Sequence, residues 1–270
     1  MQRIFLALPS YDGWRCDGNA EAAHKTATRK HQVFPVPKGG SLITGSCNYL
    51  LATALNAREQ YGFTWFAMLH ADIAPEPFFI DKMIDEAEAH GADLLSVVIP
   101  LKSTDCLTST NIGSGRRFMQ FGRLTMRQVH YHSFPRTFDI HMAADALESL
   151  PPPLGVANVP RVALLANTGC MIVRLDQPWS DRLLFRQLDA MFQLDDGTYQ
   201  ARDLSEDFYF SWRAARLGAR VMCTTTVQAT HLGQYQFPND QFGPLAIAND
   251  CVEREIATEI KTYYHTPVTA

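Results

Sequence analysis

Two potential metal ligands lie one residue apart in the segment LHADIAPEPFF, residues 69–79. His70 and Asp72 follow the apolar residues 63–69, which predict a buried strand, and two prolines come after them. Imidazole nitrogens and carboxylate oxygens are the side-chain atoms that bind divalent cations. The end of this strand is therefore the first candidate site.

Further groups of the same kind occur later in the chain. Glu206 and Asp207 open a segment with helical spacing, and His231 ends a short predicted strand. A carboxylate can act as a general base, and a distant histidine can add a second metal ligand. Each group also has an ordinary structural explanation. Asp72 could cap a helix, the acidic pair could favour a helix dipole, and a lone histidine is often only hydrogen-bonded.

The elements that must position these groups alternate between strands and helices over the first hundred residues. Apolar patterning predicts strands at 3–8, 32–36, 63–69 and 94–99, and helices at 19–30, 46–61 and 79–90. Ser46 is the predicted N-cap of the second helix and Gly62 its stop. Such alternation predicts an α/β fold with a mostly parallel sheet and helices on both faces. Ligands bind such sheets at the carboxyl ends of the strands, where His70 and Asp72 lie.

Residues 101–165 break this alternation and predict an insertion or a substrate-facing lobe. Within them, residues 102–136 carry six Lys and Arg against one acidic residue, Asp105, with aromatic residues in between. A phosphate-bearing partner such as a polynucleotide is one hypothesis for this segment. A solvated surface with a few basic side chains is the other.

The second half of the chain predicts a return to the sheet. Helices are expected at 141–150, 181–191, 206–217 and 245–260, and strands at 168–173, 220–223 and 227–231. Ser205 precedes the third of these helices and Gly218 follows it. The predicted strand 227–231 ends at His231, just as His70 and Asp72 follow the end of the predicted strand 63–69.

The composition is that of an ordinary globular protein. The chain has 270 residues, of which 46% are hydrophobic and 19% charged, with a net charge of -4 and a pI near 6.1. No global basic field is available for nucleic acid. Neither a signal peptide nor a membrane span is predicted, so we expect a cytoplasmic protein. Six cysteines without a CxxC pair argue against a structural zinc site and predict buried free thiols.

The order of these motifs resembles the GT-A family of glycosyltransferases. The resemblance lies in FAMLHADIAPEPFF for the metal motif, NTGCMIV for the acceptor-side loop, and SEDFYFSWRAARLGARVMCTTTVQATHLG for the acidic pair and terminal histidine. LALPSYDG and GSLITGSCNYLLATALN resemble the nucleotide-binding opening of that family, particularly in members encoded by bacteriophages. The resemblance covers residues 1–100 and 165–233.

This resemblance implies one GT-A domain over residues 1–270, with a Rossmann-like, mostly parallel sheet between helices. Its parts would be a nucleotide-sugar-binding half at 1–100, an inserted acceptor-side lobe at 101–165, an acceptor and catalytic half at 166–233, and a C-terminal extension at 234–270. The extension could close over the site as a lid or pack against a partner.

The resemblance also implies an activity: metal-dependent transfer of a hexose or pentose from a nucleoside diphosphate sugar, foremost a UDP-sugar, to an acceptor hydroxyl. Mn²⁺ or Mg²⁺ would be held by Asp72 and His231, and Glu206 or Asp207 would be the general base. The nucleotide would be contacted by Tyr11, Asp12, Asn48 and His70, the last standing where the family has an acid. The acceptor would be bound by Gly169, Arg116 and Arg117.

The acceptor could be a hydroxymethylated base in phage DNA, bound through residues 102–136, which would place the protein in the host cytoplasm. A glycan or a lipid-linked sugar would also suit these residues. The negative net charge and the lack of a DNA-binding motif count against DNA.

Two other functions fit some of the same residues. His70, Asp72 and His231 match by type the two-histidine, one-carboxylate site of non-haem iron, 2-oxoglutarate-dependent oxygenases. The usual fold of those enzymes is an all-β barrel, and their basic residue after the distal histidine is missing here. The third hypothesis is a nucleotide-sugar-binding module without catalytic activity.

Overall fold

The protein, in a computed structural model, is described over residues 1–11, 25–103, 107–114, 120–131, 134–149, 163–233 and 236–239. At its centre is a seven-stranded sheet. The strands, in spatial order, are β2 (Gln32–Gly39), β1 (Arg3–Ser10), β3 (Trp65–Leu69), β10 (Cys170–Arg174), β5 (Leu94–Val97), β13 (Val221–Thr224) and β8 (Thr137–Phe138). Only β10 and β8 run against their neighbours. The predicted α/β class with a mostly parallel sheet is confirmed.

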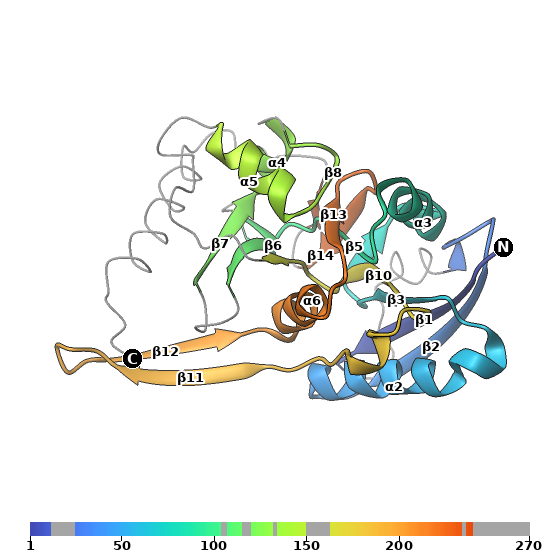
Figure 1. Ribbon diagram of the computed structural model, residues 1–270, viewed down its shortest axis with the longest axis horizontal. Helices are drawn as coiled ribbons and strands as arrows, with labels where there is room; N and C mark the ends of the chain where they lie inside the picture. The colour runs from blue at the N-terminus through green and yellow to red at the C-terminus, as the bar shows by residue number, and fades with distance from the viewer. Residues whose placement is uncertain are drawn as a thin grey trace.

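Helices cover both faces of this sheet (Figure 1). The helices are α2 (Ile43–Tyr61), α3 (Phe79–His90), α4 (Met126–Tyr131), α5 (Ile140–Glu148) and α6 (Glu206–Arg216). Side chains alternate along a strand, so Phe5 and Ala7 of β1 pack into the apolar core that includes α2, α5 and α6. Ile4 and Leu6 of the same strand pack on the opposite side, into the core formed with α3.

Three smaller sheets surround the central one. They contain β4 (Ile73–Pro75), β14 (Ala229–Leu232) and β15 (Gln236–Pro238); β6 (Leu107–Ser114), β7 (Gln120–Thr125) and β9 (Ala163–Leu165); and the hairpin of β11 (Leu188–Gln193) and β12 (Tyr199–Leu204). β14 pairs antiparallel with β4, and this register sets His231 opposite Ile73. The later strand therefore lies beside the turn that carries Asp72.

Two predicted helices differ in the structure. α2 begins at Ile43 after Leu42, so the prediction of Ser46 as N-cap was wrong, and the Ser46 N–H donates within the helix to the Leu42 carbonyl at 3.1 Å. Its stop at Gly62 is confirmed, with the left-handed φ of 65° that glycine tolerates.

The predicted helix at 181–191 was also wrong. A single 3-10 turn, Ser180–Arg182, is followed by extended chain in which Leu183 and Phe185 are buried and the residue between them is exposed. This spacing of apolar residues therefore follows the two-residue period of extended chain, which continues into β11. Of the helix predicted at 19–30, residues 19–24 lie outside the described residues, Lys25 is helical, and residues 26–30 form turns, bends and irregular chain.

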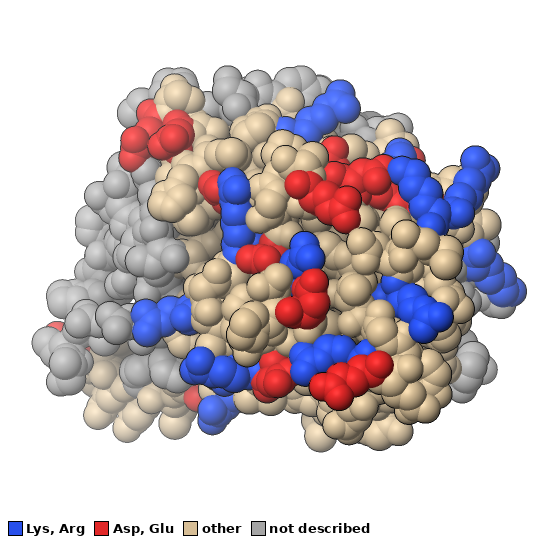
Figure 2. Space-filling view, turned by 45° about the vertical axis from the view of Figure 1, so that its right-hand side comes forward, with Lys and Arg blue, Asp and Glu red and all other residues tan. Residues whose placement is uncertain are grey.

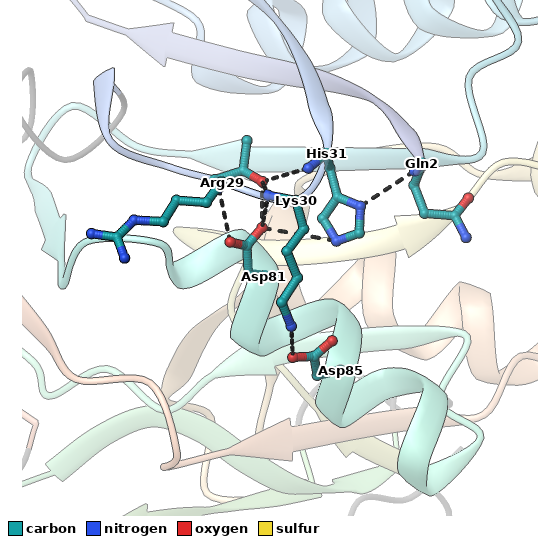
Figure 3. A network of polar contacts seen from close by, with 7 residues as sticks. Gln2, Arg29, Lys30, His31, Asp81 and Asp85 are labelled. Atoms are coloured by element: carbon teal, nitrogen blue, oxygen red, sulfur yellow. Dashed lines mark hydrogen bonds and ion pairs between the residues drawn. The ribbon is translucent and has the colours of Figure 1, made fainter.

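A polar network ties residues 28–31 to the first turn of α3 (Figure 3). Asp81, which is 6% exposed, accepts hydrogen bonds from the Arg29 N–H at 2.8 Å and from the Thr28 hydroxyl. His31 accepts from the Gln2 N–H through Nδ1 at 3.3 Å. Asp81 therefore fixes the segment that leads into β2, and so the edge of the sheet.

The surface and the cysteines agree with the composition. Basic and acidic side chains are interspersed across the face shown in Figure 2. No described helix is long and apolar enough to cross a bilayer. Cys47, Cys170 and Cys223 are buried free thiols, as predicted; Cys16, Cys106 and Cys251 lie outside the described residues.

Candidate functional site

Asp72 lies in the turn between β3 and β4. The His70 N–H donates to the Gly169 carbonyl at 2.8 Å, and the Asp72 carbonyl accepts from the Leu232 N–H at 2.7 Å, so main-chain bonds hold both ends of this turn. The Asp72 side chain is 42% exposed. It does not cap α3, because that helix begins seven residues later with Phe78 as its N-cap. Its partly exposed carboxylate is therefore not committed to a helix cap.

The orientation of His231 suits a metal ligand. Its Nδ1 lies 2.8 Å from the Pro100 carbonyl oxygen, which can only accept, so Nδ1 carries the proton. Its Nε2 lies 3.4 Å from Asp72 Oδ2. A histidine whose Nδ1–H is held by a carbonyl presents the lone pair of Nε2 to a cation, as metal-binding histidines do. With a second proton, the same ring would form an ion pair with Asp72.

Lys102 is a cationic partner of Asp72. Its Nζ lies 2.5 Å from the same oxygen, Oδ2. Partial burial acts to raise the pKa of Asp72, but the hydrogen bonds and charges of His231 and Lys102 outweigh it and hold that pKa well below its usual range. Asp72 is therefore an ionised carboxylate whose surroundings favour cations.

The distance between Asp72 and His231 fits a divalent cation. Two adjacent ligands of an octahedral ion, each about 2.1 Å from it, are about 3 Å apart, which is close to the 3.4 Å between His231 Nε2 and Asp72 Oδ2. Within the described ranges, no three His, Cys, Asp or Glu side chains are grouped to hold a metal. The two residues thus suit an ion that takes its other ligands from a diphosphate and water, as Mg²⁺ commonly does.

The acidic pair lies in the first turn of α6, beside this turn of the sheet. Ser205 provides the N-cap, and the Thr168 hydroxyl donates to Asp207. Burial raises the pKa of Glu206, and the charge of Asp207 raises it further. Burial also raises the pKa of Asp207, against the lowering effect of the hydrogen bonds from Thr168. Carboxyl groups with raised pKa values are suited to accept a proton near neutral pH.

His70 connects the two groups. Its Nε2 is buried and has no hydrogen-bond partner among the residues that the structure describes. Burial lowers the pKa of this ring, while the charges of Asp72 and Glu206 act to raise it. A neutral imidazole therefore lies within electrostatic reach of both acidic groups, and its buried Nε2 makes no hydrogen bond to the described residues.

The segment Asn167–Gly169 positions Thr168 and the end of β3. The Asn167 amide donates to the Val97 carbonyl at 2.9 Å and accepts from the Gly169 N–H at 3.0 Å. A Cβ on Gly169 would lie 3.3 Å from Ile73 Cγ1, so the residue packs closely against β4. Its predicted contact with an acceptor stays a prediction.

The other predicted binding residues are placed differently. Both amide atoms of Asn48 bind the main chain of Phe185, at 2.8 and 2.9 Å, so its predicted contact with the nucleotide stays untested. Tyr11 follows β1 and is 76% exposed. Asp12, Arg116 and Arg117 lie outside the described residues.

Comparisons with known proteins do not assign the chain to a family. No protein-family model matches it, and no curated protein sequence matches it. Among solved structures, it is similar to A197 from STIV, with a TM-score of 0.46 and 12% identity over 87% of each chain. It is also similar to TarS from S. aureus in complex with UDP-GlcNAc, with a TM-score of 0.38 and 10% identity over 100% of this chain and 68% of that one.

A third similar structure is UDP-glucose pyrophosphorylase complexed with UDP-glucose, with a TM-score of 0.35 and 8% identity over 98% of this chain and 99% of that one. Similarities of this size carry no functional argument. The geometry of the site must carry it instead.

Two features of the site were not predicted from the sequence. The contact of Lys102 with Asp72 joins residues 30 positions apart, and Thr168 holds Asp207 from 39 positions away. A signal for Lys102 was its place shortly after the predicted strand 94–99, at the same edge of the sheet as Asp72.

Proposed function

We propose that the chain is a glycosyltransferase that moves a sugar from a nucleoside diphosphate sugar to an acceptor hydroxyl. Asp72 and His231 would hold a divalent cation, Mn²⁺ or Mg²⁺, against the diphosphate. Such an ion, when bound, neutralises the charge that develops on the leaving diphosphate.

The observation that carries this proposal is that the pKa values of two acidic groups at one edge of the sheet are shifted in opposite directions. The pKa of Asp72 is lowered by its contacts with Lys102 and His231, whereas burial raises the pKa of Glu206. Acidic groups whose pKa values are driven apart in one site are suited to different tasks, one as a permanent anion and the other as an acid or base. Asp72 suits the cation, and Glu206 suits the proton.

Glu206 is the better candidate for the general base. The Thr168 hydroxyl donates a hydrogen bond to Asp207, whereas no side chain among the described residues forms a hydrogen bond with the Glu206 carboxyl group. In an inverting transfer, the acceptor oxygen bonds to the anomeric carbon and its proton passes to the Glu206 carboxylate. The bond from the anomeric carbon to the diphosphate oxygen breaks, and the nucleoside diphosphate leaves with that electron pair.

The oxygenase hypothesis has less support from the geometry. A facial triad needs three ligands around one ion, and the described residues contain no such group of three. The central parallel sheet also differs from the all-β barrel of that class.

The first experiment is a thermal-shift panel of UDP, GDP and CDP, and of their common sugar conjugates, each with Mn²⁺. A ligand at a hundredfold excess over its Kd stabilises the folded state by about 2.7 kcal/mol. We expect one nucleotide with Mn²⁺ to raise the Tm, and Asp72→Ala and His231→Ala to abolish the rise. A matching sugar conjugate should then be hydrolysed slowly to the nucleoside diphosphate.

Asp176→Ala is the matched control. Asp176 forms a surface ion pair with Arg174 at 2.9 Å and is 39% exposed, much as Asp72 is, but it lies outside the site. This variant should keep the full shift. A shift that survives Asp72→Ala, or no shift with any nucleotide, would contradict the proposal. Binding without any turnover would favour the non-catalytic module.

A further inference from the structure

One short segment supplies two groups to the cation site. Pro100 holds Nδ1 of His231 through its carbonyl, and two residues later Lys102 places its ammonium 2.5 Å from Asp72 Oδ2. The Leu101 N–H donates to the Leu107 carbonyl at 2.8 Å, which fixes the main chain between them. Lys102 is therefore held at the site by its main chain, while its side chain is 37% exposed.

The Lys102 ammonium and a divalent cation would compete for the same carboxylate oxygen. Asp72 Oδ2 is both the atom that contacts Lys102 and the atom nearest to His231 Nε2. Two cations that contact one oxygen repel each other, and a nearby anion offsets this repulsion because it attracts both. A diphosphate brings that negative charge to the same place.

We propose that Lys102 is a diphosphate-binding residue that rests on Asp72 until the nucleotide arrives. This inference rests on the function proposed above. Half-exposed ion pairs between Lys and Asp contribute little to stability, so Lys102 can leave Asp72 at small cost. Its flexible stem and compact charge suit a lysine that moves to a phosphate group. In the bound state Lys102 faces the phosphate oxygens, and Asp72 is free to hold the cation.

This arrangement predicts two effects of opposite sign for Lys102→Gln. Without nucleotide, Mn²⁺ should bind about threefold more tightly, because its competitor at Asp72 is gone. Without metal, inorganic pyrophosphate should bind about tenfold more weakly, because a charge-assisted hydrogen bond is lost. A lysine that only stabilised the fold would cause neither change.

The experiment measures both affinities on the full chain. Binding of Mn²⁺ alone is followed by electron paramagnetic resonance, and binding of pyrophosphate in EDTA by titration calorimetry. Lys82→Gln is the matched control, because Lys82 forms a comparable surface ion pair with Glu76 at 2.6 Å, away from the site. Its affinities should equal those of the wild type, and both variants should keep the wild-type circular dichroism spectrum.

Each outcome decides the matter. Tighter Mn²⁺ binding with unchanged pyrophosphate binding would show that Lys102 only competes with the metal, and would overturn the proposal. No pyrophosphate binding by the wild type, or equal binding by Lys102→Gln, would overturn it as well. If the wild type binds no Mn²⁺, the metal of the proposed function is refuted, and the metal-free pyrophosphate titration still tests Lys102 by itself.

Discussion

Substitution of Asn48 tests whether this residue stabilises the fold or binds the nucleotide. Its side-chain amide donates to the Phe185 carbonyl at 2.8 Å and accepts from the Phe185 N–H at 2.9 Å. Phe185 is 1% exposed and stacks on Phe210 of α6, with ring centroids 4.1 Å apart. Asn48 thus ties α2 to the segment that packs under the helix with the acidic pair. We expect Asn48→Ala mainly to lower the free energy of unfolding, and to weaken nucleotide binding less.

The size of the effect follows from the two bonds. Each contributes about 1 kcal/mol, and leaving the Phe185 main-chain groups unpaired adds about 1–3 kcal/mol where water cannot reach them. Because Asn48 itself is only half-buried, water will satisfy part of this loss. The free energy of unfolding should therefore fall by about 2–4 kcal/mol. Asn48→Asp should lower the free energy of unfolding at least as much, because a carboxylate cannot donate to the Phe185 carbonyl.

Urea denaturation of both variants measures this loss. Thr53→Ala is the control on the same helix, since the Thr53 hydroxyl donates only to the Tyr49 carbonyl one turn earlier and is exposed. Alanine favours a helix over threonine, so stability should stay the same or rise slightly. A loss below about 0.5 kcal/mol for Asn48→Ala, together with weaker nucleotide binding, would refute this reasoning and support the contact that the GT-A resemblance implies.

Two further predictions concern acidic side chains. Glu206→Gln should raise the Tm at pH 8, and this gain should shrink toward pH 4. Burial and the charge of Asp207 raise the folded-state pKa of Glu206 above its unfolded value. The ionisation of Glu206 therefore lowers stability as the pH rises through that range, and glutamine removes this loss. Melting curves over this pH range check it, and an equal gain at every pH would contradict it. Asp81→Ala should lower the free energy of unfolding by about 2–4 kcal/mol, because the Arg29 N–H and a hydroxyl lose a buried acceptor. Asp85→Ala, which removes only an exposed ion pair, should change denaturation little.

The regular elements could be predicted where one apolar period dominates. The helix at residues 79–90 ends at Gly91 as expected, because its buried face repeats with helical spacing and glycine accepts the left-handed φ of 66°. The direction of β10 could not be predicted. Residues 170–173 are an apolar run buried on both faces, and such a run carries no signal for parallel or antiparallel pairing.

The site was predictable in part for a similar reason. Asp72 shortly follows one predicted strand and His231 ends another, and the resemblance to GT-A enzymes suggested them together; the pairing of β4 with β14 then brings them within 3.4 Å. The role of Asn48 rested on the resemblance alone, and no sequence pattern links it to Phe185, 137 residues away. Contacts between distant loops depend on packing, which has no local period in the sequence.

The acidic pair of α6 differs from an ordinary helix cap elsewhere in the protein. Asp139 caps α5: it accepts from two backbone N–H groups at 3.0 Å, and these bonds with the Arg220 guanidinium outweigh burial and lower its pKa. In α6 Ser205 has that task, and the pKa values of Glu206 and Asp207 are raised instead. A favourable helix dipole would lower them, so the dipole does not explain why two half-buried carboxyl groups have raised pKa values here. Burial at a cost in stability is expected where a carboxyl group must exchange a proton, as the proposed transfer requires.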